Sequence, residues 1–173
     1  MRGRRAQGGR RVRLDRPQAS LTITAGRIGF LVVAAIVFIA DRVTKDLVTA
    51  TVPYGTEFAA IDHLVWITNI HNSGAAFGLA PAFALVFLLA SFGVACGLVV
   101  YVFTHRDPVP ADIVLGLVLG GTVGNLFDRV MFGTVTDFVA VHFWPVFNVA
   151  DSAVSTGVVL LLLGYVLRRP KSA

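Results

Sequence analysis

PAFALVFLLASFGVACGLVVYVF, residues Pro81–Phe103, is a run of 23 residues without a charged side chain. A helix needs about 20 mostly apolar residues to cross the hydrocarbon core of a bilayer. The whole chain of 173 residues is 55% hydrophobic and 14% charged, with a mean hydropathy of +0.75. Soluble domains are nearer ~25% charged. The run therefore predicts a transmembrane helix, and the composition predicts a membrane protein.

Three further segments are long and apolar enough to cross a bilayer. They run from about Ile28 to Leu47, from about Ala111 to Arg129 and from about Val149 to Leu167. The four spans predict an all-α membrane protein with a single domain over residues 28–167. A cleaved signal peptide with its apolar core at Ile28–Ala40 is an alternative, but no small-x-small cleavage site follows that core.

The basic residues lie where the spans end. Of the 15 Lys and Arg residues, twelve fall in residues 1–27, in the turn Thr104–Pro110 and in residues 168–173. The positive-inside rule then places both termini and this turn in the cytoplasm, with the loops Val48–Ala80 and Val130–Asn148 outside. We expect residues 1–27 to be a disordered, Arg-rich tail that touches anionic lipid, and residues 168–173 to be a second basic tail. This distribution of the net charge of +5 argues against a nucleic-acid partner.

The two outward loops contain more than linker sequence. Residues Leu64–Thr68 are β-branched and aromatic, which predicts a short strand. Residues Val141–Phe147 are strongly apolar for a loop. Trp144 and its neighbours are therefore expected at the level of the lipid headgroups.

Polar residues gather at the outward ends of the spans. They form three groups, namely Asp41 with Lys45, Asn125 with Asp128 and Arg129, and Asn148 with Asp151. Spacings of three and four residues put the members of a group on one helical face, where Asp41 can pair with Lys45. Each group also has a structural interpretation: ion pairs for the first two, and a helix cap with a dipole-complementing charge for the third. These interpretations do not explain why all three groups lie at one end, which indicates a site there.

Asp137 and Asp151 are the two carboxylates best suited to chemistry. Both lie next to apolar sequence, and the 13 residues between them allow the chain to fold back. Two carboxylates held close together in a low-dielectric site share a proton and titrate as a pair. One can then activate water while its protonated partner polarises a carbonyl group. This pattern predicts proteolysis that needs neither a metal nor a cofactor.

At these residues the sequence resembles the lipoprotein signal peptidases, the signal peptidase II family. The first block, D-x-x-T-K, matches Asp41–Lys45, and the second, N-x-G-x-A-F-G, matches Asn72–Gly78. The third, G-G-x-x-G-N-x-x-D-R, matches Gly120–Arg129. The two aspartate motifs match Val135–Phe138 and Phe147–Asp151. The resemblance covers roughly residues 28–167; the Arg-rich tail and a short stretch between Phe138 and Phe147 depart from it.

The resemblance implies an aspartyl endopeptidase of the bacterial inner membrane. Such enzymes cleave diacylglyceryl-modified prolipoproteins on the N-terminal side of the lipidated cysteine, and globomycin-type cyclic peptides inhibit them. It also implies a small extracytoplasmic β-cradle over four transmembrane helices, with the active site at the outer face. The catalytic dyad falls on Asp137 and Asp151. The positions that bind substrate or support the site fall on Asp41, Lys45, Asn72, Gly74, Asn125, Asp128, Arg129 and Asn148.

Three other functions fit the sequence less well. A Ser–Lys peptidase would use Ser73 with a neutral Lys45, although Asp41 lies one turn away. A proton-coupled transporter would place its ionisable residues near the bilayer midplane, often in repeated halves, and neither feature occurs. Zinc binding through His63, His71 and His142 lacks the H-x-x-x-H and H-E-x-x-H spacings. The single cysteine, Cys96, lies in an apolar span and is expected to be inert.

Overall fold

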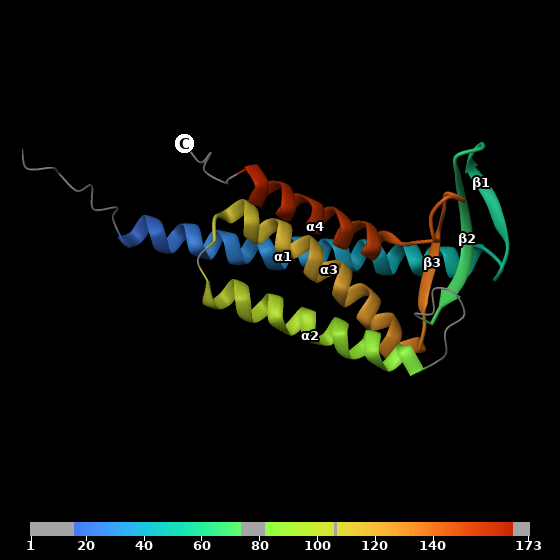
Figure 1. Cartoon of the computed structure of the whole chain (residues 1–173), viewed down its shortest axis with the longest axis horizontal. Coiled ribbons are helices and arrows are strands. Elements are labelled where there is room, and N and C mark those ends of the chain that lie inside the picture. The colour runs from blue at the N-terminus through green and yellow to red at the C-terminus, as the bar shows by residue number, and fades with distance from the viewer. Residues whose placement is uncertain (1–15, 74–81, 106, 168–173) are drawn as a thin grey trace, which may run out of the picture.

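The computed structural model describes residues 16–73, 82–105 and 107–167. Four long helices run side by side, and a small sheet crosses one end of the bundle (Figure 1). The helices are α1 (Arg16–Thr51), α2 (Ala82–Thr104), α3 (Val109–Phe132) and α4 (Val149–Leu167). The strands are β1 (Glu57–Ile61), β2 (Val65–Asn72) and β3 (Val135–Ala140).

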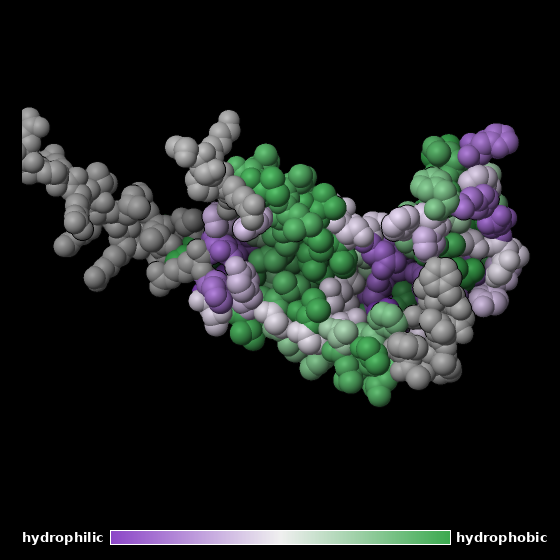
Figure 2. Space-filling model, in the orientation of Figure 1, coloured by the Kyte–Doolittle hydropathy of each residue, from purple (hydrophilic) through white to green (hydrophobic). Residues whose placement is uncertain are grey.

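Four of the described helices are long and apolar enough to cross a membrane, namely Ile23–Thr51 within α1, Leu85–Thr104 within α2, and the whole of α3 and α4. The four predicted spans and the all-α membrane class are therefore confirmed. The lipid-facing side chains are apolar and exposed, as Leu85 and Leu89 illustrate. Figure 2 shows a broad apolar band over the helices and a hydrophilic patch between this band and the sheet.

The first helix begins earlier than predicted. Residues 16–27 were expected to belong to a disordered tail, but α1 starts at Arg16. The only proline in this region is Pro17, which lies in the first turn, where its missing N–H leaves no hydrogen bond unmade. Nothing downstream of it interrupts the helix before the apolar span. Residues 1–15 and 168–173, the rest of the two predicted tails, lie outside the described residues.

Helix α3 lies at the centre of the bundle because its glycines allow other helices to approach closely. A Cβ atom added at Gly120 would lie 2.6 Å from the carbonyl oxygen of Ala34 in α1. One added at Gly121 would overlap the carbonyl oxygen of Ala150 in α4. Small residues of this kind let membrane helices pack backbone against backbone. They bring the outer ends of α1, α3 and α4 together, which is where the polar residues lie.

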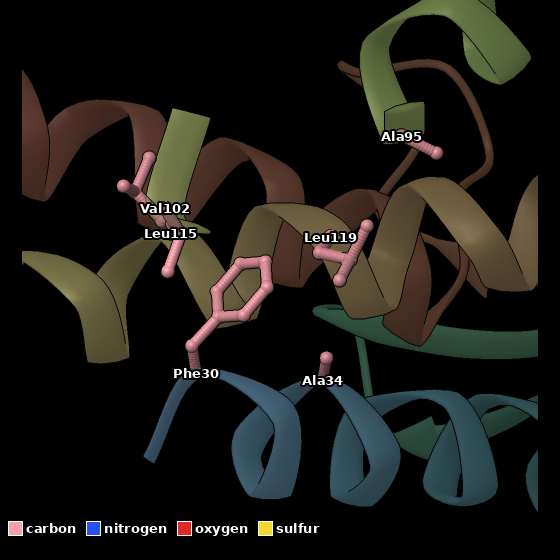
Figure 3. Packing of buried hydrophobic residues seen from close by; sticks show 6 residues of the cluster. All are labelled: Phe30, Ala34, Ala95, Val102, Leu115 and Leu119. Carbon is pink, nitrogen blue, oxygen red and sulfur yellow. The ribbon is translucent and has the colours of Figure 1, made fainter. Parts of the chain in front are cut away.

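The apolar core lies between α1, α2 and α3. Phe30 is fully buried and points from α1 toward α3, where Leu115 and Leu119 pack around it (Figure 3). Val102 and Ala95 close the cluster from α2. This core lies away from the sheet, so it fixes the bundle without occupying the polar end.

The sheet is antiparallel with the strand order β1-β2-β3. The strand predicted at Leu64–Thr68 is confirmed, although β2 extends it to Asn72. The cradle implied by the resemblance is also present. Helix α3 ends at Gly133, whose left-handed backbone (φ 76°) lets the chain turn directly into β3. The register then pairs Asp137 with Ile70 of β2, which fixes Asp137 at the end of the bundle.

Candidate active site

Lys45 is the centre of a buried polar cluster. Its Nζ lies 2.7 Å from Oδ2 of Asp41, one turn earlier on α1, which confirms the predicted pair. The same Nζ lies 3.0 Å from Oδ2 of Asp128 and donates a 2.9 Å hydrogen bond to Oδ1 of Asn125, both on α3. Lys45 has no exposed side-chain surface, and Asp41 and Asp128 have almost none. A buried cation with two carboxylates joins α1 to α3 at the polar end.

Asp128 does not pair with Arg129, contrary to the structural interpretation of these neighbours. Adjacent residues on a helix point about 100° apart, so they do not face each other. Asp128 bonds instead to Lys45 and to Arg42 of α1. Nη1 of Arg129 donates to the carbonyl oxygen of Asn125 at 3.3 Å and to Ser91 of α2 at 3.4 Å. Arg129 therefore lies at the edge of the cluster, facing α2.

Arg42 is a site residue that the sequence analysis missed. It bonds both to Asp128 and to Asp46, whose Oδ1 lies 2.7 Å from Nη2 of Arg42. A signal was available, since Arg42 is three residues before Lys45 and so shares its helical face. The D-x-x-T-K motif leaves position 42 unspecified, so the motif itself does not select this arginine.

Asn148 caps α4 and also contacts both candidate catalytic carboxylates. Its Oδ1 accepts a 2.9 Å hydrogen bond from the backbone N–H of Asp151, and its own N–H donates to Oδ2 of Asp151 at 3.3 Å. This is a reciprocal capping box. Its Nδ2 donates to Oδ1 of Asp137 at 2.7 Å. Asn148 thus contacts the Asp137 carboxylate through its side chain and the Asp151 carboxylate through its backbone N–H.

Asp137 is held by two amides and is almost fully buried, with 2% of its surface exposed. Asn72 donates to its Oδ2 at 2.9 Å, opposite the bond from Asn148. Burial raises the pKa of Asp137 to about 6; the two hydrogen bonds lower the pKa, and the nearby charge of Asp151 raises it. Asp137 therefore holds a proton far more readily than an exposed carboxyl group.

Asp151 is only half-buried and connects the pair to the lysine cluster. Nδ2 of Asn125 donates to Oδ1 of Asp151 at 2.7 Å, and Oδ1 of Asn125 accepts from Lys45. The first turn of α4 is also tied to α1, because the N–H of Ala150 donates to Oδ1 of Asp41 at 2.9 Å. Residues from three helices and two strands thus form one continuous network.

Most of the predicted site residues come together in this network. They are Asp41, Lys45, Asn72, Asn125, Asp128, Asp137, Asn148 and Asp151, with Arg129 at the edge. Gly74 lies outside the described residues. Within the described ranges, no group of three or more His, Cys, Asp or Glu residues could hold a metal ion.

Two grooves meet at Asp151. We call the first the three-helix groove; it has a volume of about 430 Å³ and is lined by residues of α2, α3 and α4, among them Phe87, Asn125, Arg129 and Val154. The second has a volume of about 350 Å³ and lies between α4 and the loop 141–147. A larger cavity of about 580 Å³ lies at the opposite end of the bundle, beside Tyr101 and Tyr165. That larger cavity contains none of the network residues, so size alone does not identify the site.

Known proteins are similar to this chain in both sequence and fold. A family model described as signal peptidase (SPase) II matches residues 33–167. The chain belongs to the signal peptidase II family. The family consists of aspartic peptidases, so the chain is a peptidase of this type and a multi-pass membrane protein.

Individual relatives support this assignment. A lipoprotein signal peptidase of Rhodococcus jostii is 41% identical over 143 residues, covering 79% of this chain and 72% of that protein. One of Pelotomaculum thermopropionicum is 39% identical over 131 residues, covering 75% of this chain and 86% of that protein. A bacterial membrane enzyme solved in meso at 1.9 Å superposes with a TM-score of 0.74 and 29% identity, over 82% of this chain and 94% of that one.

The geometry disfavours a Ser–Lys peptidase mechanism for this member of the signal peptidase II family. A lysine that acts as a base must be neutral, which requires that few negative charges surround it. Nζ of Lys45 instead lies within 3.0 Å of carboxylate oxygens of both Asp41 and Asp128. Lys45 is therefore engaged by two ion pairs that join α1 to α3, a geometry suited to organising the site.

Proposed function

We propose that this protein removes signal peptides from diacylglyceryl-modified prolipoproteins by cleaving on the N-terminal side of the lipidated cysteine. Asp137 and Asp151 activate the attacking water. The observation that carries the proposal is that Asn148 contacts both carboxylates at the point where two grooves meet. The names of the relatives support the same substrate class.

The proposed reaction begins with one proton shared by the pair. The ionised carboxylate takes a proton from water, and the resulting hydroxide attacks the scissile carbonyl carbon. The protonated partner gives its proton to the carbonyl oxygen, which forms a gem-diol intermediate. The C–N bond then breaks as the first carboxyl protonates the leaving amine, and the second takes back a hydroxyl proton. The products are a carboxylic acid and an amine, and the pair again holds one proton.

The neighbouring side chains support this chemistry by fixing the pair. Asn72 and Asn148 hold the two oxygens of Asp137, while Asn125 holds one oxygen of Asp151. Lys45 fixes Asn125 in turn. Because the orientation of each carboxylate is set before substrate arrives, little reorganisation is needed during the reaction.

This mechanism requires no metal, cofactor or thiol. We therefore expect full cleavage activity in excess EDTA. Alkylation of Cys96 should also leave the rate unchanged, because this thiol is exposed on the bilayer side of α2. Loss of activity in EDTA that zinc restores would contradict this scheme of water activation.

We further propose that the protein lies in the bacterial inner membrane with both termini in the cytoplasm and the site at the outer face. The start of α1 and the end of α4 lie at the end of the bundle opposite the sheet (Figure 1). In the sequence, the basic residues concentrate before and at the start of α1, between α2 and α3, and after α4, as the positive-inside rule requires of a cytoplasmic face. The three-helix groove descends from Asp151 along α2 and α4, where it could receive an apolar signal segment. Globomycin-type inhibitors are expected to occupy the same site.

The test is cleavage of a purified diacylglyceryl-modified prolipoprotein by the purified protein. Mass spectrometry should find a product that begins with the lipidated cysteine. Cleavage at any other bond would contradict the proposed specificity. No cleavage of the lipidated substrate would contradict the proposed function as a whole.

A further inference from the structure

The second groove at Asp151 has no part in the mechanism above. We call it the loop–α4 groove; it is lined by Trp144, Phe147, Asp151, Ser152, Ser155 and Thr156. Asp151 and Ser155 also border the three-helix groove. Two grooves therefore border the same candidate catalytic carboxylate.

The α4 side of the loop–α4 groove carries a stripe of hydroxyl groups. Ser152, Ser155 and Thr156 are exposed, and their spacing of three and four residues puts them on one face of the helix. Below them the sequence from Gly157 to Leu163 is wholly apolar. At 1.5 Å of rise per residue, Thr156 lies ~7.5 Å below Asp151 along the helix axis. The groove thus changes from polar to apolar a short distance below the carboxylates.

The opposite wall of the groove is aromatic and is held firmly in place. Trp144 is 63% exposed and Phe147 is partly buried. Phe147 is joined to β3 by two backbone hydrogen bonds with Val139, of 2.8 and 3.0 Å. This pairing anchors the C-terminal end of the loop 141–147.

His142 anchors the other end of the same loop. Its ring stacks on Trp66 of β2, with the ring centroids 3.7 Å apart and the planes at 20°. Its Nε2 lies 3.5 Å from Oε2 of Glu57 in β1. His142 also has a left-handed backbone (φ 55°), which is uncommon for a residue other than glycine. Its contacts with two strands hold this end of the loop that carries Trp144.

We propose that the loop–α4 groove binds the diacylglyceryl group of the substrate and that His142 is a positioning residue for its aromatic wall. This inference rests on the proposed function. The glyceryl ester carbonyls match the hydroxyl stripe, in which Ser155 and Thr156 can donate hydrogen bonds to them. The hydroxyl of Ser152 donates instead to the carbonyl oxygen of Asn148 at 3.0 Å. The first methylenes of the acyl chains match Trp144, Phe147 and the apolar part of α4. The three-helix groove is left for the signal segment, so lipid and peptide lie on opposite sides of Asp151.

The experiment compares one lipidated prolipoprotein with an unlipidated peptide of the same sequence, in one detergent at one concentration. The measured quantity is the lipid preference, defined as the ratio of kcat/KM for the lipidated form to kcat/KM for the unlipidated form. Because both values come from the same preparation, the ratio does not depend on how much of a variant is folded.

Variants of the groove should lower this ratio. Thr156→Val removes one hydroxyl at nearly constant volume and should lower the ratio about threefold, the value of one ordinary hydrogen bond. Trp144→Ala removes the aromatic wall and should lower it about tenfold. Thr122→Val is the matched control, because Thr122 lines only the three-helix groove and should affect both substrates alike.

The positioning role is tested by a second matched pair. His142→Asn tolerates the left-handed backbone but loses the stack on Trp66, so it should raise KM for the lipidated form with little change in kcat. His63→Asn is the control, because His63 has the same backbone conformation (φ 57°) but contacts only the adjacent Asp62 within the described ion pairs and ring contacts.

The outcomes separate this inference from the function on which it rests. If the wild type prefers the lipidated form and Thr156→Val and Trp144→Ala keep the wild-type ratio, the groove assignment is wrong and the function stands. Equal losses for both substrates would assign the groove to the peptide instead. If the wild type cleaves neither substrate, the function itself fails.

Discussion

Asp137 illustrates how a fold changes the chemistry of a single residue. In sequence it is a loop acid between Thr136 and Phe138. In the fold it is buried, and two amides bond to its oxygens. The strand that buries it pairs with β2, more than sixty residues earlier in the chain. The environment that sets its protonation is therefore non-local, although the motif around it was enough to select it.

This environment makes the stability of the protein depend on pH through Asp137. Its pKa rises from 3.8 when unfolded to about 6 when folded, so the folded state binds the proton more tightly. Wild type therefore loses stability as pH rises from about 4 through about 6, by up to ~3 kcal/mol. Asp137→Asn cannot titrate and escapes this loss. Thermal unfolding in detergent should show that the stability of Asp137→Asn relative to wild type increases as pH rises over this range.

Asp137→Asn also disrupts a hydrogen bond to the side chain. This loss changes the difference in stability between the variant and wild type by the same amount at every pH, so the pH dependence of that difference is unchanged. Asp62→Asn is the control, because Asp62 is 83% exposed and should show no such trend. A difference between Asp137→Asn and wild type that stays flat from pH 4 to pH 7 would mean that the carboxyl is not desolvated.

The helices were predictable from sequence to a greater degree than the strands. An apolar run of about 20 residues carries its own signal, so the boundaries of α2 and α4 were predicted to within one residue. β1 and β3 are five and six residues long and are defined by their pairing partners. Their presence came only from the family resemblance. Similarly, the bond between Arg42 and Asp128 joins residues 86 positions apart, which no local pattern reveals.

The close approach of the helices α3 and α4 should determine where Asp151 lies. Gly121→Ala places a methyl group against the backbone of Ala150, so α4 must move or the bundle must loosen. We expect a loss of stability of about 1–3 kcal/mol, the usual cost of overpacking, and a clear loss of cleavage activity. Thermal unfolding and kcat on the lipidated substrate measure the two effects.

Gly93→Ala is the matched control for this substitution. A Cβ atom at Gly93 of α2 would meet nothing within 4 Å. Alanine is the better helix former by up to ~1 kcal/mol, so this variant should be neutral or slightly more stable. Equal behaviour of the two variants would show that the contact between α3 and α4 does not position the site.

The charged residues of the whole molecule fall into two groups with different positions. Basic residues flank the spans at one end, whereas the buried carboxylates, Lys45 and Arg42 form a compensated network at the other. The single exposed thiol, Cys96, lies within a span. Cys96 is the only cysteine in the sequence, so a thiol introduced elsewhere can be labelled on its own once Cys96 is replaced.

Topology can therefore be measured in a Cys96→Ser background. Asp62→Cys introduces a thiol in the turn between β1 and β2, and Ser172→Cys introduces one near the C-terminus. A membrane-impermeant maleimide applied to intact spheroplasts should label the first but not the second, which should react only after permeabilisation. The reverse pattern would contradict the proposed orientation, because it would place the carboxylates in the cytoplasm.

The most direct test of the account is turnover of the lipidated prolipoprotein by Asp137→Asn and by Asp151→Asn, with Asp62→Asn in the exposed turn between β1 and β2 as the control. Each of the two Asn variants removes one titrating carboxyl group and keeps nearly the same shape. The account predicts that both insert into the membrane and lose at least ~10³-fold in rate, corresponding to ~4 kcal/mol of transition-state stabilisation, while Asp62→Asn stays active. Cleavage above about a tenth of the wild-type rate, less than ~1.4 kcal/mol of lost stabilisation, by either Asp137→Asn or Asp151→Asn would contradict it.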